Sequence, residues 1–190
     1  MIHHFTENLN TRGLIVECAP KVVVEAGCGQ STLQLLNLSK ELGFRMILVD
    51  VQDDPVTPGS LGLTPGELTS LRGIELLYGV SYLGFEKLPD GFIDVAIVDT
   101  DHNGWTLAKE LAVLERKVRD GGIVILHDTF AFRDVNGTMS CYASGEIPYP
   151  LEEILAGPTM GQVVDEYRQK WEVIRETDES NGAIAFRVRA

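Results

Sequence analysis

The sequence predicts an α/β protein with a doubly wound, mostly parallel sheet and an antiparallel strand near the carboxyl terminus. Short apolar segments alternate with amphipathic segments along the chain, which is the order expected when helices connect neighbouring parallel strands. Several apolar segments are continuous, so we expect strands that are buried on both faces. The last two apolar segments are separated by a short polar turn, which is typical of a hairpin.

The expected strands are short segments rich in β-branched and other apolar residues, and most of them end at a glycine or an aspartate. Such residues favour the turn that must follow a strand. The parallel strands are predicted at 21–27, 44–51, 74–79, 93–99 and 122–128. Segments 171–176 and 182–190 form the expected hairpin, which turns at Ser180-Asn181-Gly182.

Helices are predicted between these strands, where apolar residues recur at spacings of three and four. The first, 31–43, places Leu33, Leu36 and Leu42 on one side and stops at Gly43. The second, 105–122, has an apolar face and is expected to end at its two glycines; that face consists of Leu107, Leu111, Leu114 and Val118, and the glycines are Gly121 and Gly122. Two further helices are expected at 151–157 and 162–171.

Length and charge limit the classes of protein that the chain can represent. Its 190 residues suit one domain, 1–190, with a helical extension at 1–20. A net charge of −12 argues against nucleic acid and against an anionic membrane surface as partners, because both attract basic proteins. The cysteines, Cys18, Cys28 and Cys141, show no paired spacing, so we expect reduced thiols and a cytoplasmic location.

Two long segments interrupt the alternation of strands and helices. Residues 52–68 are rich in proline and glycine, and residues 130–150 carry four aromatic side chains. Long irregular loops in a compact domain are often functional. Each follows the carboxyl end of an expected parallel strand, which is the edge where open α/β sheets bind ligands. Aromatic side chains in such a loop suit an apolar acceptor, although they also pack for structural reasons.

A glycine-containing turn follows the first strand, in the sequence VVVEAGCGQST from Val22 to Thr32. Gly27 and Gly29 allow a close approach of the backbone to a ligand at the start of the next helix. The segment is not a phosphate-binding P-loop, and it lacks the third glycine of a dinucleotide-binding fingerprint. Glu25 would repel phosphate and suits a cationic ligand group. A bound cofactor is therefore favoured over an ordinary turn, and an NAD-linked oxidoreductase is a weaker alternative.

Acidic residues close three further strands. Asp50 lies about 20 residues beyond the glycine turn, where a carboxylate accepts hydrogen bonds from the ribose of an adenosine cofactor. Asp99 and Asp128 each end a strand, so both should reach the ligand edge. Two carboxylates at one point form part of a site for a hard cation such as Mg²⁺.

The segment VDTDHNGW, from Val98 to Trp105, has two interpretations. Asp101 and Asn103 suit a functional role and the cap of the next helix equally well. His102 is a candidate general base, with a solvated loop histidine as the alternative. His127 precedes Asp128 in the same strand, so alternation predicts that its side chain points to the other face, in a packing or supporting role.

Together these motifs resemble the class I S-adenosylmethionine-dependent methyltransferases, which have a Rossmann-like fold. The likeness is greatest to small O-methyltransferases of the catechol and caffeoyl-CoA type and to relatives of the cephalosporin-biosynthesis methyltransferase. It covers roughly residues 21–130. The resemblance implies cofactor contacts at the glycine turn, at the end of the second strand, at the adenine border and beside the fourth strand; these are Glu25, Gly27, Gly29, Ser31, Asp50, Val51, Val80, Ser81 and Asp99.

The same resemblance implies a divalent cation and a catalytic residue. Asp99 and Asp128 match the two metal-binding aspartates of the metal-dependent members. Thr129 stands where those members have a ligating asparagine, and a hydroxyl is a poorer ligand. His102 stands where they place a catalytic lysine.

The expected function is thus S-adenosylmethionine-dependent O-methylation of a small-molecule hydroxyl, assisted by Mg²⁺ or another divalent cation. Two alternatives remain: a metal-independent methyltransferase acting on nitrogen or oxygen, and a binding protein of this fold without catalysis. A homodimer is a family-level expectation. The identity of the acceptor does not follow from the sequence.

Overall fold

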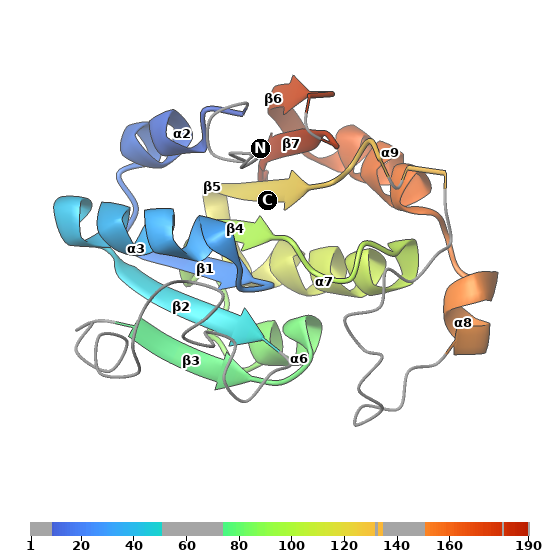
Figure 1. Ribbon diagram of the computed structural model, residues 1–190, viewed down its shortest axis with the longest axis horizontal. Coiled ribbons are helices and arrows are strands. Elements are labelled where there is room, and N and C mark those ends of the chain that lie inside the picture. The colour runs from blue at the N-terminus through green and yellow to red at the C-terminus, as the bar shows by residue number, and fades with distance from the viewer. Residues whose placement is uncertain (1–8, 51–73, 132, 135–150, 180, 190) are drawn as a thin grey trace.

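The expected sheet is present in the structure, a computed structural model that describes residues 9–50, 74–131, 133–134, 151–179 and 181–189. Within these residues a seven-stranded sheet has the order β3-β2-β1-β4-β5-β7-β6 (Figure 1). Strands β1 to β5 pair in parallel, and β7 runs antiparallel between β5 and β6. Their bounds are β1 Val22–Ala26, β2 Arg45–Asp50, β3 Ile74–Tyr78, β4 Ile93–Val98, β5 Val118–His127, β6 Glu172–Thr177 and β7 Ala183–Arg187.

Helices cover both faces of the sheet, as a doubly wound fold requires (Figure 1). One face carries α2 and α3, and the other carries α6, α7 and α9; α8 lies against α7. The helices are α2 Thr11–Cys18, α3 Gln30–Leu42, α6 Ser81–Glu86, α7 Gly104–Lys117, α8 Leu151–Ala156 and α9 Met160–Lys170. The helix α2 lies in the segment expected to be a helical extension. No helix in the described ranges is long and apolar enough to cross a bilayer.

Each face of the sheet has its own hydrophobic core, because successive strand residues point to opposite faces. In β1, Val22 and Val24 pack on the α7 side, whereas Val23 packs on the α3 side. In β4, Val98 and Val95 divide between the two cores in the same way. The continuous apolar segments of the sequence are therefore explained by burial on both faces.

The carboxyl-terminal hairpin forms as predicted. Asn181 and Gly182 both have positive φ, 75° and 87°, the left-handed conformation that a tight hairpin turn requires and that these residue types tolerate. The hairpin brings β7 beside β5, where Leu126 pairs with Ile184.

The end of the helix at 105–122 was predicted wrongly. The helix α7 stops at Lys117, and Val118 begins β5, where it is buried and pairs with Ile93. The next pair in the register is Val95 with Ile123, so two steps along β4 correspond to five steps along β5. The additional residues of β5 form an irregularity inside the strand. Gly121, with φ 73°, lies in that irregularity and does not end a helix.

The buried face of α3 also differs from the prediction. Leu35, Leu36 and Leu38 are buried, whereas Leu42 is 40% exposed. Leu42 lies in the last turn, where Glu41 and the C-cap Gly43 are exposed as well, so this end of the helix extends past the core. The predicted stop at Gly43, with φ 78°, is confirmed.

Candidate active site

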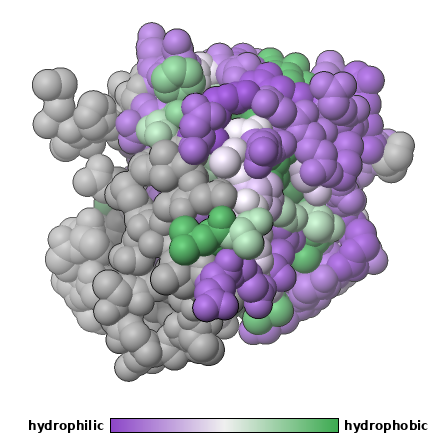
Figure 2. All heavy atoms as spheres, turned by 90° about the vertical axis from the view of Figure 1, so that its right-hand side faces the viewer, coloured by the Kyte–Doolittle hydropathy of each residue, from purple (hydrophilic) through white to green (hydrophobic). Residues whose placement is uncertain are grey.

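Four acidic residues meet at the carboxyl-terminal edge of the parallel strands. Glu25 lies near the end of β1, Asp50 closes β2, Asp99 follows β4 and Asp128 follows β5. Parallel strands place their carboxyl ends on the same edge of a sheet, which is the usual ligand edge of this architecture. Figure 2 looks onto this side of the molecule, where hydrophilic residues cover most of the described surface.

The glycine turn packs directly against the segment that follows β4. Gly27 has a φ of 82°, and a Cβ atom on it would lie 1.8 Å from the carbonyl oxygen of Asp99. The two segments are joined by a hydrogen bond from the amide of Asp99 to the carbonyl oxygen of Ala26, at 2.9 Å. Gly27 is therefore required by the fold itself, in addition to any contact with a cofactor.

The second glycine faces open space. A Cβ atom on Gly29 would have no described heavy atom within 4 Å. The turn is held from the other side by Asp50, whose Oδ2 accepts a hydrogen bond from the amide of Cys28 at 2.8 Å. Asp50 thus orders the turn, while the space beside Gly29 leaves room for a ligand to approach the backbone.

Glu25 is a fully buried carboxyl group with unused hydrogen-bonding capacity. Its Oε1 accepts a hydrogen bond from the Ser31 hydroxyl at 2.6 Å, and its Oε2 has no hydrogen-bond partner among the described residues. Burial raises the pKa of Glu25 to about 8, more than the Ser31 hydrogen bond lowers it. Ser31 therefore orients Glu25, and Glu25 offers one oxygen to a ligand.

The Glu25→Gln variant should become more stable than the wild type as the pH rises. In the unfolded chain the Glu25 carboxyl loses its proton near pH 4.5, but in the folded chain only near pH 8. The folded wild type therefore holds the extra proton between these values, and its stability falls as the pH rises through them. We expect a difference of about 4 kcal/mol at pH 8, or roughly 8–16 °C in Tm. Thermal unfolding of both proteins without cofactor, from pH 5 to pH 8.5, measures it; parallel Tm curves would contradict it.

Asp99, His102, His127 and Asp128 form a compact cluster of two carboxylates and two imidazoles. One donor atom from each lies within 4.8 Å of the others. Nε2 of His102 is 3.1 Å from Asp99 Oδ1 and 2.8 Å from Asp128 Oδ2. Nδ1 of His127 is 3.2 Å from Asp99 Oδ1 and 3.3 Å from Asp128 Oδ1. The structure thus brings together the three residues that the sequence suggested and adds His127.

The prediction that His127 points away from Asp128 was wrong, and the backbone explains why. Alternation applies only while both residues are in extended conformation. The strand β5 ends at His127, and Asp128 has a φ of 55°, so the chain turns there and both side chains reach the same side. His102 also has a positive φ, 53°. Left-handed conformation at two non-glycine residues is a cost that often marks functional sites.

The charges in this cluster stabilise one another. Burial would raise the pKa of Asp99, but hydrogen bonds with His102 and His127 lower it to about 2. Burial would lower the pKa of His102, but the interactions with Asp128 and Asp99 raise it to about 10. The pKa of His127 is also raised, because the hydrogen bond and the charge of Asp99 outweigh burial. Without another cation, the His102 imidazole holds its proton at neutral pH.

Asp101 and Asn103 begin the helix α7. Asn103 is the N-cap, and its Oδ1 accepts a hydrogen bond from the Thr106 amide at 2.8 Å. Asp101 is buried and accepts from Asn103 Nδ2 at 2.5 Å and from the Thr106 hydroxyl at 2.9 Å. Of the two sequence interpretations, helix capping is therefore confirmed for Asn103, and Asp101 holds that cap in place.

A buried glutamate that the sequence analysis missed lies behind the cluster. Glu110 is 1% exposed, and its Oε1 accepts hydrogen bonds from Ser81 and, at 2.9 Å, from Thr100. Burial, followed by the charge of Asp101, raises the pKa of Glu110 to about 7. In the sequence, Glu110 looks like the other charged residues of its helix. Only its buried contacts with Ser81 and Thr100 distinguish it from a solvent-exposed glutamate.

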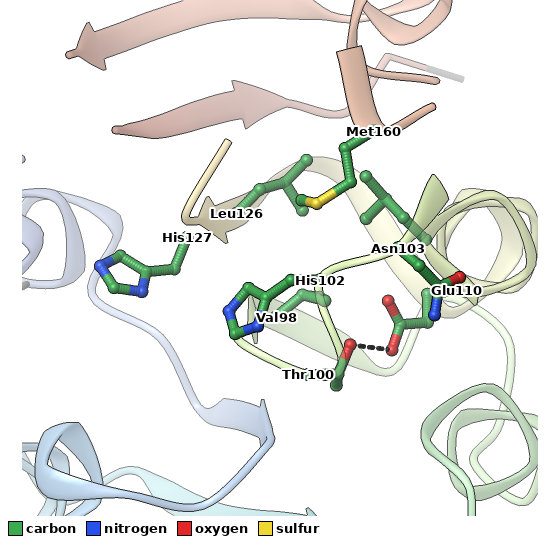
Figure 3. A pocket seen from close by; sticks show the side chains of 9 residues that line it. Val98, Thr100, His102, Asn103, Glu110, Leu126, His127 and Met160 are labelled. Atoms are coloured by element: carbon green, nitrogen blue, oxygen red, sulfur yellow. Dashed lines mark hydrogen bonds between the residues drawn. The ribbon is translucent and has the colours of Figure 1, made fainter. Parts of the chain in front are cut away.

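A cavity of about 10 Å³ separates Glu110 from the two histidines. Figure 3 shows His102 and His127 at this cavity, on the loop after β4 and at the end of β5. Such a volume holds about one water molecule, so the cavity is too small for a methyl acceptor.

For the remaining predicted site residues, the contacts in the structure do not test the predicted roles. The Ser81 side chain is buried and turned to Glu110, and Val80 is the N-cap of α6, so the expected adenine border still rests on the resemblance. Thr129 lines a separate hollow of about 400 Å³ with Phe130 and Arg133, and its role as a metal ligand stays a prediction. Val51 lies outside the described residues, as do the whole of segment 52–68 and most of segment 130–150.

Comparisons with solved structures support the fold. A methyltransferase from Podospora anserina with bound SAH (S-adenosylhomocysteine) is 15% identical over 94% of this chain and 76% of its own, with a TM-score of 0.63. A candidate caffeoyl-CoA O-methyltransferase from Staphylococcus aureus is 12% identical over 98% and 85% of the two chains, with a TM-score of 0.67. A candidate O-methyltransferase from Klebsiella pneumoniae is 13% identical over 100% and 84%, with a TM-score of 0.63.

The sequence comparison identifies the family. No curated protein matches this chain. The family described as "Methyltransferase domain" matches residues 24–129, more than half of the chain, from within β1 through Thr129. That span contains every motif on which the resemblance rests, including the glycine turn and the four clustered residues. The chain therefore belongs to this methyltransferase family, and it has the Rossmann-like fold of the three methyltransferase structures above.

Proposed function

We propose that this protein transfers a methyl group from S-adenosylmethionine to a hydroxyl of a small molecule, with the help of a divalent cation. The observation that supports this most strongly is the convergence of a cofactor turn and a cation-binding cluster at one edge of the sheet. The two are in direct contact, since Gly27 packs against the backbone of Asp99. Donor and acceptor sites must be adjacent in this way for group transfer.

The residues at the glycine turn suit S-adenosylmethionine. The unpartnered Oε2 of Glu25 can accept a hydrogen bond from a cationic ammonium group. Asp50 already binds the Cys28 amide, and a carboxylate can accept further hydrogen bonds from ribose hydroxyls. The open space beside Gly29 lets the cofactor reach the backbone. The cofactor supplies the methyl group; the protein's part is to bind it in a fixed orientation.

Asp99 and Asp128 are the residues that would hold the cation. Each is largely buried, and both present oxygen atoms to the same small volume. A bound divalent cation would lower the pKa of an acceptor hydroxyl and orient it toward the cofactor. Imidazoles beside the carboxylates keep the two negative charges compatible in the apoprotein.

The role of His102 as general base stays a prediction, and the structure specifies what it requires. A base must be neutral to accept a proton, whereas contact with Asp128 and Asp99 raises the pKa of His102 to about 10. His102 can accept a proton at neutral pH only when something else neutralises these two carboxylates. Chelator-resistant transfer would favour the metal-independent alternative, and cofactor binding without transfer to any acceptor would favour the binding-protein alternative.

Asp50→Asn should weaken the binding of S-adenosylmethionine about 10- to 100-fold. The change removes a charged acceptor worth about 1.5–3 kcal/mol, and it places an amide group where the Cys28 amide now donates. Isothermal titration calorimetry with S-adenosylmethionine measures the affinity. Asp120→Asn, the same change at an exposed position near the start of β5, is the matched control. Failure of the wild type to bind the cofactor would refute the proposed function.

A further inference from the structure

We propose that Asp99, His102, His127 and Asp128 form a single cation site that selects a first-row transition-metal dication such as Zn²⁺ over Mg²⁺. The inference rests on the proposed function, because it concerns the cation that the function employs. It differs from the expectation drawn from the sequence, in which oxygen atoms from Asp99, Asp128 and Thr129 hold a Mg²⁺-like ion. The chemistry of the four donors and their spacing both support the inference.

The donor atoms are mixed, two imidazole nitrogens and two carboxylates. Mg²⁺ binds oxygen ligands and retains several of its waters, so it gains little from imidazole. Zn²⁺ and its neighbours in the first row bind imidazole and carboxylate together. A site in which half of the donor residues are histidine therefore favours the transition ion.

The donors lie close enough together to surround one small ion. A tetrahedral ion with ligand bonds of about 2.0 Å has donors about 3.3 Å apart. The nitrogen–oxygen separations in the cluster are 3.1, 2.8, 3.2 and 3.3 Å. They run from His102 to Asp99 Oδ1, to His127 and to Asp128 Oδ1, and the other oxygen of Asp128, Oδ2, faces His102. With one donor atom from each residue, all four lie within 4.8 Å of one another, so closing a tetrahedral shell requires the longest separation to shorten by up to about 1.5 Å.

A second observation points to a ligand at the same place. Asp128 is 8% exposed, and its Oδ1 makes no hydrogen bond with any described residue, although His127 Nδ1 lies 3.3 Å away. A buried carboxylate oxygen without a hydrogen bond is costly unless something binds it. The left-handed backbone at His102 and Asp128 is what turns both side chains into the cluster. The fold therefore bears a backbone cost to assemble these donors.

The proposal changes the part played by His102. Its Nε2 faces both carboxylates and is the atom that would bind the ion. A nitrogen that ligates a cation cannot also accept a proton from the methyl acceptor. His102 would then hold the cation, and acidification of the hydroxyl by that cation would take over the task assigned to a base.

The test is a competition titration of the full-length chain with Zn²⁺ and with Mg²⁺ against a chromophoric chelator. We expect one Zn²⁺ per chain, bound at least 100-fold more tightly than Mg²⁺. His102→Gln and His127→Gln should each weaken Zn²⁺ binding by at least about 10- to 100-fold. This is the loss seen when a residue that only hydrogen-bonds a metal ligand is removed, and removal of a ligand itself should cost no less. Both variants should leave Mg²⁺ affinity within a factor of about three. With Co²⁺ in place of Zn²⁺, the visible absorption spectrum reports four-coordination, and it should change in both variants.

Three controls keep the result specific to this cluster. Binding of S-adenosylhomocysteine, at a site that does not include the histidines, shows that each variant is folded. Asp120→Asn, which changes an exposed carboxylate outside the cluster, should leave Zn²⁺ affinity unchanged. Background binding by the adjacent histidines near the start of the chain is removed by making all measurements in the His3→Ala, His4→Ala protein.

The outcomes distinguish this inference from the proposed function. If Mg²⁺ binds as tightly as Zn²⁺, or if the histidine variants bind Zn²⁺ like the wild type, the inference is wrong while cation-assisted transfer survives. If neither ion binds and transfer continues in chelator, the cation part of the proposed function is wrong as well. In that case His102 and His127 are the permanent hydrogen-bonding and ion-pair partners of Asp99 and Asp128.

Discussion

Replacing Gly27 by alanine is expected to destabilise the folded protein by about 3 kcal/mol or more and to abolish cofactor binding. The new Cβ atom would lie 1.8 Å from the backbone oxygen of Asp99, and the residue has a φ of 82°. The steric clash and the unfavourable φ both involve backbone atoms, which cannot move aside as a flexible side chain would. Relief of the clash requires the ends of β1 and β4 to separate, and that would disrupt both the glycine turn and the cation cluster.

Gly29→Ala is the matched control for this experiment. It lies in the same turn, its φ of −160° is open to any residue, and its Cβ atom would meet nothing within 4 Å. We expect its free energy of unfolding to stay within about 0.5–1 kcal/mol of the wild type. Its affinity for S-adenosylmethionine should nevertheless fall, because the methyl group occupies the space proposed for the cofactor.

Urea denaturation and calorimetric titration with S-adenosylhomocysteine measure the two effects separately. Wild-type stability in Gly27→Ala would show that β1 and β4 are not held as closely as the structure places them. Wild-type affinity in Gly29→Ala would move the cofactor away from this part of the turn.

Asp128→Asn is expected to lower kcat by at least about 100-fold while leaving cofactor affinity nearly unchanged. Asparagine has the shape of aspartate and tolerates the positive φ of 55° at this position, so the backbone should be retained. The substitution removes one of the two negative charges that would hold the cation. It also changes the atom that lies 2.8 Å from His102 Nε2, now Asp128 Oδ2. In asparagine this atom becomes either the amide nitrogen, which cannot accept a hydrogen bond, or the neutral amide oxygen, which is a weaker acceptor than a carboxylate.

Initial rates with saturating S-adenosylmethionine and an active acceptor measure the effect on turnover. Asp120→Asn should retain the wild-type rate, because Asp120 is exposed near the opposite end of β5. Turnover of Asp128→Asn within a factor of three of the wild type would show that this carboxylate has no part in catalysis. Such a result would leave the glycine turn and its cofactor role untouched.

Local sequence signals were sufficient for the strands and for the residues at their carboxyl ends. Continuous β-branched segments led to β1, β2, β4 and most of β5, because burial on both faces selects for such residues. The turn at Asn181 and Gly182 led to the hairpin, because few other residues tolerate its backbone. A boundary such as that of α7 was less predictable, since Val118 suits a helix face and a strand equally well.

The chemistry of the site depended on contacts that are distant in sequence. His127 was assigned to the wrong side because alternation was carried one residue past the end of β5. Glu110 drew no attention because a glutamate on a helix is ordinary until Ser81 and Thr100 bind it in a buried place. Gly27 was identified as a cofactor residue, and its contact with the backbone of Asp99 became visible only in three dimensions.

The sequence alone therefore determined the fold class, the glycine turn after β1 and the edge of the sheet at which the acids gather, because periodicity and turn chemistry are local properties. The tertiary structure decided which of those residues touch. The left-handed backbone at His102 and Asp128 and the parallel pairing of β4 with β5 assemble two carboxylates and two imidazoles into one cluster. Whether a histidine is a ligand, a base or a packing residue depends on distances such as 2.8 Å from His102 to Asp128 and 3.2 Å from His127 to Asp99, which join residues far apart in the sequence, and no local pattern encodes them.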